Sequence, residues 1–138
     1  MKESIIDTDI LSYYLKGDRK VIQNVLTYLD AYPTLNISSI SYFEILAGLE
    51  YKKATSKIKA VKSFSSNCRI INVDKVSLEI SAKKYGELRR TGTTISHADL
   101  LIAGIAIKNK LCLVSNNTKH FKGVKSLKLS NWKDQILK

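Results

Sequence analysis

The sequence predicts an α/β domain of three layers, in which helices cover both faces of a central parallel sheet of four to five strands. The first indication is alternation, because short β-branched and apolar runs are separated by longer segments with helical spacing. The second is that these runs are apolar throughout, as is typical of parallel strands buried on both faces. The chain has 138 residues, 44% of them hydrophobic, with no repeat or linker. We therefore expect one domain spanning residues 1–138.

The first half of the chain should contribute two strands and four helices. A buried strand is expected at Ser4–Ile6, followed by a helix at Ile10–Leu15 that ends at Gly17. Apolar residues at helical spacing predict a second helix over Val21–Leu29, which ends before the only proline, Pro33. The remaining elements of this half are a strand at 35–38, a helix from 41 to 49 and a helix around 58–64.

The second half should add three strands and two helices. The β-branched run Arg69–Val73 predicts a strand, and the apolar spacing along 76–88 predicts a long basic helix that ends at Gly92. A helix from Ser96 to Ile107 is apolar nearly all round, which indicates a central position. Further strands are expected at 111–114 and, as a short fifth one, at 127–129.

The chain is strongly basic, with 23 Lys and Arg against 12 Asp and Glu and a formal net charge of +11. Such an excess favours a polyanionic partner, and a nucleic acid is the expected one. Cys68 and Cys112 form no CxxC or Cys/His motif, and the N-terminus has no signal-peptide apolar region. The apolar run Leu100–Ile107 is too short to span a membrane. A reduced, cytoplasmic protein is expected.

Four acidic residues lie in apolar surroundings: Asp7 and Asp9 in one segment, Glu44 in a second and Asp99 in a third. A buried carboxylate needs a hydrogen-bond, cationic or metal partner, because burying it alone is costly. All three segments, and the Ser115–Asn117 loop after the fourth strand, should meet at the carboxyl edge of the sheet. Hard carboxylate oxygens select Mg²⁺ or Mn²⁺ over zinc, so the acids predict a magnesium or manganese site.

Helix capping is an alternative explanation for the same acids. Ser41–Glu44 and Ser96–Asp99 each have the spacing of a capping box, in which an acid in the first turn bonds back to the cap backbone. Asp7 would likewise cap the helix expected near Asp9. Three separate caps do not require the acids to lie where strand ends converge, so a shared metal site is the preferred interpretation.

The motifs around these acids, taken together, resemble those of the PIN-domain family, and within it the VapC-type toxins of type II toxin–antitoxin pairs. The matching segments are Ile5–Leu11, Ser41–Gly48, Ser96–Ala103 and Leu113–Phe121. The resemblance extends over nearly the whole chain in order and spacing. It implies a PIN-like fold, a Mg²⁺- or Mn²⁺-dependent endoribonuclease activity, a homodimer, and a cognate VapB-type antitoxin that covers the active site.

Matched by position, Asp7, Glu44 and Asp99 correspond to the three family acids that hold the metal. Asp9 stands where the family commonly has Asn or Asp, and would bind metal through water or orient Asp7. The family's fourth acid usually lies in the loop after the fourth strand, where this chain has Asn117. Asn117 remains a candidate catalytic residue, but its neutral oxygen implies that a second metal would bind weakly or only together with substrate phosphate.

The expected reaction is attack of a metal-activated water on the phosphorus, which leaves a 5′-phosphate and a 3′-hydroxyl. Lys119 and Lys122, close to Asn117, are the candidate phosphate contacts, whereas most other basic residues are expected to be solvated. His120 could touch the same region, but it is expected to be a surface or capping residue, and His97 is expected to pack structurally. The RNA target itself is not encoded in any short motif.

Two other functions remain open. A non-catalytic PIN-like nucleic-acid-binding module would account for Asn117, and metal-dependent RNA cleavage would exclude it. Asp7-Thr8-Asp9 also resembles the DxD signature of phosphohydrolases that form an aspartyl-phosphate. Those enzymes need a late acidic pair, which is missing here.

Overall fold

A five-stranded sheet runs through the molecule in the order β3-β2-β1-β4-β5, and every neighbouring pair is parallel. The computed structural model describes residues 1–138. The strands are β1 (Ser4–Ile6), β2 (Asn36–Ser38), β3 (Arg69–Ile71), β4 (Cys112–Val114) and β5 (Leu129–Ser130). The prediction of a parallel sheet is confirmed, with the short fifth strand present.

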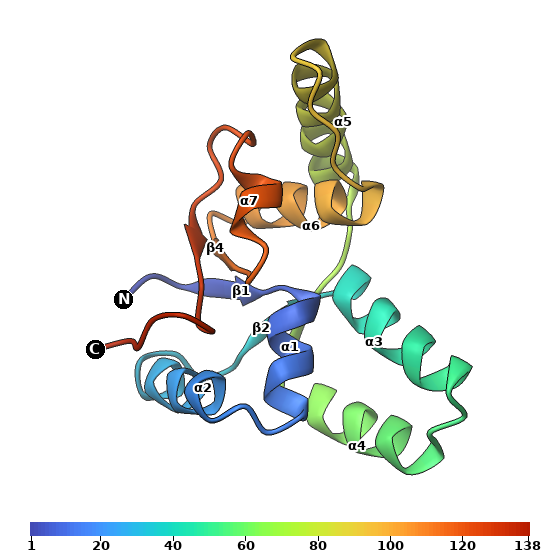
Figure 1. The fold of residues 1–138 in the computed structure, drawn as a ribbon, viewed down its shortest axis with the longest axis vertical. Coiled ribbons are helices and arrows are strands. Elements are labelled where there is room, and N and C mark those ends of the chain that lie inside the picture. The colour runs from blue at the N-terminus through green and yellow to red at the C-terminus, as the bar shows by residue number, and fades with distance from the viewer.

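Seven helices connect and cover these strands. They are α1 (Thr8–Leu15), α2 (Arg19–Ala31), α3 (Ser39–Tyr51), α4 (Thr55–Ser65), α5 (Lys75–Arg90), α6 (His97–Lys108) and α7 (Thr118–Phe121). Figure 1 shows α1 and α2 on one side of β1, and α6 and α7 on the other, while α5 extends away from the sheet. The three-layer α/β/α arrangement is therefore confirmed. None of the helices combines the length and hydrophobicity needed to span a lipid bilayer.

The core has two parts, one on each face of the sheet. Ile5 packs with buried residues of α6 and β4 on one face, whereas Ile6 packs with buried residues of α1 and α2 on the other. This division follows from strand geometry, because successive side chains point to opposite faces. The sheet is therefore covered on both sides, as its apolar strands predicted.

Helix α3 begins earlier than the sequence suggested. Ser38 is the N-cap, and its hydroxyl accepts a hydrogen bond from the Ser41 N–H at 2.9 Å. The expectation that Ser41 opens the helix was wrong because β2 passes into α3 without an intervening loop. Glu44 is consequently the sixth residue of α3 and lies beyond the first turn.

The two helices α5 and α6 approach each other closely at Gly104. A Cβ atom added to Gly104 would lie 2.0 Å from Ser81 Oγ and 2.6 Å from the Ser77 carbonyl oxygen. Ser81 Oγ also donates a 2.8 Å hydrogen bond to the Leu100 carbonyl. Only glycine fits at this contact, which fixes the position of α6 and of the acid near its start.

Candidate active site

The acidic residues lie where the strand order of the sheet reverses. From β1 the chain first builds outward through β2 and β3, and later adds β4 and β5 on the opposite side. Asp7 directly follows β1, and its N–H donates to the Val114 carbonyl of β4 at 2.9 Å. Ligands of open α/β sheets bind at such a switch point. The structure thus confirms that β1 and β4 end side by side at the edge where a site was expected.

Asp7 is the most buried of the candidate acids, with 5% of its surface exposed. Its Oδ1 accepts from the Thr8 N–H at 2.8 Å, and its Oδ2 accepts from Ser115 Oγ at 2.8 Å. Burial raises the pKa of Asp7 to about 7, and the charges of Asp9 and Asp99 add to the shift. No ion pair of the protein includes Asp7. The charged form of Asp7 is therefore disfavoured, and no cationic side chain pairs with its carboxylate.

Asp9 connects the start of α1 to the loop after β4. Its Oδ1 accepts from the Ile10 N–H at 2.7 Å, and its Oδ2 accepts from the Asn116 N–H at 3.0 Å. Burial raises the pKa of Asp9, and the charge of Asp99 contributes to the same shift. The Asn116 side chain contacts Tyr13 Oη at 3.4 Å and accepts from Asn131 at 3.1 Å. Asn116 thus holds the loop against Asp9.

Glu44 is oriented by a chain of hydroxyl groups and is not a helix cap. Its Oε1 lies 2.6 Å from Thr8 Oγ1, which in turn lies 2.9 Å from Ser41 Oγ. An ionised carboxylate can only accept, so the Thr8 hydroxyl donates its single proton to Glu44. The Thr8 oxygen therefore accepts the hydrogen bond from the Ser41 hydroxyl. Ser38 Oγ donates to Ser41 Oγ at 3.2 Å and completes the chain. The capping-box alternative is therefore excluded for Glu44.

Asp99 occupies the first turn of α6, where the Ser96 hydroxyl accepts from its N–H at 3.1 Å. This is one half of the capping box that the sequence suggested. The carboxylate instead extends toward α7, and its Oδ2 lies 3.9 Å from His120 Nδ1. His120 is exposed, as expected, and it also lies beside Asp99, which supports the less favoured alternative that it touches the same region. His97 packs edge-on against Tyr85, with ring centroids 5.8 Å apart, in agreement with the structural role expected for it.

The donor chemistry suits a hard divalent cation. The acids offer only carboxylate oxygens, and the unbalanced charge around buried Asp7 would be relieved by a cation. However, no three His, Cys, Asp or Glu side chains are grouped as ligands of one ion. Glu44 is turned toward Thr8 and Asp99 toward His120. These contacts use only Oε1 of Glu44 and Oδ2 of Asp99, so each carboxylate keeps a second oxygen for a cation, and the donor set fits a divalent metal.

The loop after β4 carries the remaining candidates. Asn117 is exposed and precedes α7, with no hydrogen bond from its side chain to the helix start. Its N–H donates to Ser115 Oγ at 3.0 Å. Lys119 and Lys122 are exposed, within and just after α7. The structure thus gathers the loop beside Asp7, while both lysine side chains remain free in solvent.

Sequence reasoning missed the hydroxyl and amide groups that hold the acids. Thr8 and Ser115 bond to candidate acids, and the Asn116 backbone N–H bonds to Asp9. All three lie within motifs already singled out for their acids. Thr8 lies next to two acids, and Ser115 and Asn116 lie in the loop expected to face them. These positions could have predicted the contacts, because buried carboxylates need hydrogen-bond donors.

The chain matches a model of the PIN domain over residues 4–127, a range that includes Asp7, Glu44 and Asp99. It is 36% identical over 135 residues to ribonuclease VapC2 of Rickettsia felis, and this match covers 93% of the chain and 96% of the relative. It is 24% identical over 133 residues to the tRNA(fMet)-specific endonuclease VapC of Shigella flexneri, covering 96% of this chain and 99% of that protein.

Solved structures of VapBC complexes have a similar fold. The fold superimposes with a TM-score of 0.84 and 31% identity on the crystal structure of VapBC2 from Rickettsia felis bound to a promoter DNA fragment, covering 94% of this chain and 98% of that one. The DNA-bound VapBC of Salmonella typhimurium also gives a TM-score of 0.84, with 25% identity, covering 96% of this chain and 99% of that one.

Proposed function

Because this chain belongs to the PIN-domain family, we propose that it is a metal-dependent endoribonuclease and the toxin of a toxin–antitoxin pair. The observation that carries the proposal is the position of Asp7. It is buried at the switch point of the sheet, near Asp9 and Asp99, with no cationic side chain to balance it. A carboxylate pocket in a chain of net charge +11 suits a substrate with a phosphate backbone. The relatives named as ribonucleases support RNA as that substrate.

The residues that would hold Mg²⁺ or Mn²⁺ are Asp7, Glu44 and Asp99, with Asp9 as a further ligand. A divalent cation bound there supplies an acidified water and neutralises charge on the phosphate. Asp7 must release a proton when it takes up the cation, because its pKa is raised to about 7.

Hydroxyl groups of the protein orient two of these acids by hydrogen bonds. Ser115 holds Oδ2 of Asp7, and the Thr8 hydroxyl holds Glu44. Such partners of metal ligands fix their orientation and typically contribute about 10–100-fold to metal affinity or activity. Lys119 and Lys122 stand near the loop that contacts Asp7 and would attract the substrate backbone.

The partners follow from the similar structures. Those of Rickettsia felis and Salmonella typhimurium are VapBC complexes bound to DNA. We therefore assign to this chain a cognate VapB-type antitoxin; the family resemblance further implies that this antitoxin would block the acidic site and that the chain forms a homodimer. The Shigella flexneri relative is named as specific for tRNA(fMet), so initiator tRNA is the first substrate to test.

The test compares the wild-type protein with Asp99→Asn and with the matched control Asp30→Asn, which alters an exposed acid of α2. Initiator tRNA and total bacterial RNA are incubated with each protein in Mg²⁺, Mn²⁺ or EDTA. We expect metal-dependent products with 5′-phosphate and 3′-hydroxyl ends from the wild type and the control only. Expression of these two proteins should also arrest bacterial growth. RNA binding without any metal-dependent cleavage would instead support the non-catalytic nucleic-acid-binding module.

A further inference from the structure

A cavity of about 260 Å³ lies between α1, α3 and α4. Its apolar wall is formed by aliphatic side chains from all three helices, including Leu15, Ile45, Leu49 and Val61. The volume is close to the roughly 300 Å³ at which small-molecule pockets begin. It therefore has room for one flat, largely apolar group, such as a single nucleobase.

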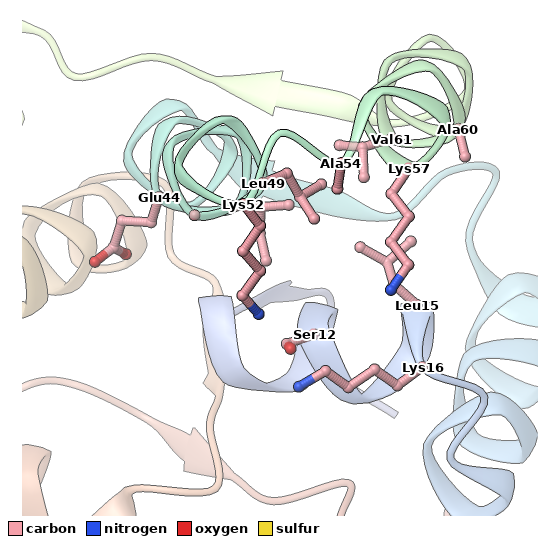
Figure 2. Close-up of a pocket in the computed structure, with 12 residues that line it drawn as sticks. Ser12, Leu15, Lys16, Glu44, Leu49, Lys52, Ala54, Lys57, Ala60 and Val61 are labelled. Atoms are coloured by element: carbon pink, nitrogen blue, oxygen red, sulfur yellow. The ribbon is translucent and has the colours of Figure 1, made fainter.

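Three lysines surround the cavity, and each comes from a different part of the chain. Lys16 follows α1, Lys52 follows α3, and Lys57 lies in the first turn of α4. None of the three takes part in an ion pair. Figure 2 shows the side chains of Lys52 and Lys57 extending from α3 and α4 toward α1, and that of Lys16 running along α1. Like charges that converge without a counter-ion favour binding of an anion.

Glu44 connects this cavity to the acidic site. It belongs to the cavity lining, but its carboxylate points away from the three lysines (Figure 2). That carboxylate accepts the hydrogen bond from Thr8, whose own N–H binds Asp7. Glu44 therefore lines both the acidic site and the apolar cavity that the three lysines surround.

We infer that this cavity is a subsite for a nucleotide next to the cleaved bond, with its base on the aliphatic wall and its phosphate among Lys16, Lys52 and Lys57. The inference rests on the proposed function, because a strand cleaved at the acidic site must continue to either side of it. RNA fits better than an acidic peptide because each nucleotide pairs one anionic group with one flat base. A single phosphate can also contact several ammonium groups at once.

The test uses a pair of matched double variants. Lys52→Gln/Lys57→Gln removes two charges from the cavity, whereas Lys59→Gln/Lys62→Gln removes two exposed charges of α4 that do not line it. Both variants lower the net charge equally, and melting temperatures check that both are folded. Affinity for fluorescein-labelled initiator tRNA is measured in EDTA, so that no cleavage occurs, over a range of salt concentrations.

We expect the cavity variant to bind the tRNA about tenfold more weakly than the control variant. The slope of log affinity against log salt should become shallower by about 0.7 for each lost phosphate contact. Equal affinities and slopes for the two variants would overturn the subsite. So would a cavity variant that binds RNA like the control but loses affinity for the purified antitoxin, since the cavity would then be a protein-docking site.

The same proteins separate this inference from the proposed nuclease activity. If wild-type protein cleaves RNA in Mn²⁺ but the two double variants bind tRNA alike, the nuclease stands and the subsite fails. If wild-type protein cleaves no RNA but only the cavity variant loses affinity, the RNA subsite stands and the nuclease assignment fails.

Discussion

The hydroxyl group of Thr8 donates a 2.6 Å hydrogen bond to Glu44, joining the helix after β1 to the helix after β2. The backbone N–H of the same residue donates to Asp7 at 2.8 Å. One residue therefore orients two of the three acids to which we assign the metal. The first prediction tests this arrangement.

Thr8→Val removes the hydroxyl group and keeps the side-chain shape. We expect Mn²⁺ affinity, measured by isothermal titration calorimetry, to fall about tenfold because Glu44 loses the donor that orients it. The free energy of unfolding should fall by only about 1 kcal/mol, the usual contribution of one hydrogen bond. Thr8→Ser retains the hydroxyl and should bind Mn²⁺ like the wild type. Unchanged affinity in Thr8→Val would remove Thr8 from the metal site.

The second prediction concerns Glu44 itself. Glu44→Gln keeps an oxygen that can accept from Thr8 but removes the negative charge, so RNA cleavage should be lost. The free energy of unfolding should change by no more than about 0.5 kcal/mol, because the residue is partly exposed and caps no helix. RNase assays and denaturant titration of the same preparation measure both effects. Full cleavage by Glu44→Gln would return this residue to a structural role.

The third prediction concerns pH and Asp7. Its pKa is raised from 3.8 to about 7, so between these values the native state keeps a proton that the unfolded state loses. The associated stability is present below about pH 4 and is lost as the pH rises to about 7. In EDTA, the wild type should be roughly 2–3 kcal/mol less stable at pH 8 than at pH 5.

Asp7→Asn should remove most of this loss and be more stable than the wild type at pH 8. Asp30→Asn should retain the full pH dependence, and a smaller slope from Asp9 should persist in both variants. Chemical denaturation at several pH values measures the effect. A wild-type protein with equal stability at pH 5 and pH 8 would contradict the buried-charge description of the site.

The fourth prediction concerns Asn117, where the chain departs from the family. Asn117→Asp adds an anionic ligand next to the loop that contacts Asp7, so the Mg²⁺ concentration for half-maximal cleavage should fall. Mn²⁺ should support cleavage by the wild type at lower concentrations than Mg²⁺, because its geometric demands are less strict. Asn72→Asp adds the same charge to an exposed residue between β3 and α5 and serves as the control. Superimposable metal titrations for wild type and Asn117→Asp would leave Asp9 as the candidate for the fourth ligand.

The fifth prediction tests the contact between α5 and α6. Gly104→Ala should lower the free energy of unfolding by about 1–3 kcal/mol, because its Cβ would meet Ser81 Oγ and the Ser77 carbonyl. Gly48→Ala is the matched control in α3, where an added Cβ has no atom within 4 Å. It should stabilise the protein by about 0.4–1 kcal/mol. Equal melting temperatures for the two variants would show that α5 and α6 adjust to the added methyl group.

Local patterns were sufficient to predict the sheet and the edge where β1 and β4 end side by side. Gly17 ends α1 with a φ of +87°, a conformation that glycine adopts without strain. The apolar runs around Ile5 and Leu113 became paired central strands. The meeting of Asp7 with the loop after β4 was predictable because the carboxyl ends of parallel strands share one edge.

The partners of the acids were harder to predict, because they depend on contacts between distant segments. Ser115 donates to Asp7 across 108 residues of sequence, and Thr8 reaches Glu44 across 36. Spacing along a helix or strand contains no information about such pairs. The start of α3 was misplaced for another reason: three serines lie within four residues, and each is a good N-cap.

The central position of β1 has a consequence for how the protein is made. This strand is synthesised first, yet its neighbour β4 and the Ser115 partner of Asp7 follow more than 100 residues later, at a separation of 108. At roughly 5–20 residues per second, several seconds of translation separate these two halves of the site. Until Ser115 has been synthesised, a nascent chain therefore has no complete acidic pocket. The proposed ribonuclease would leave the ribosome and messenger that produce it intact until that segment has been made.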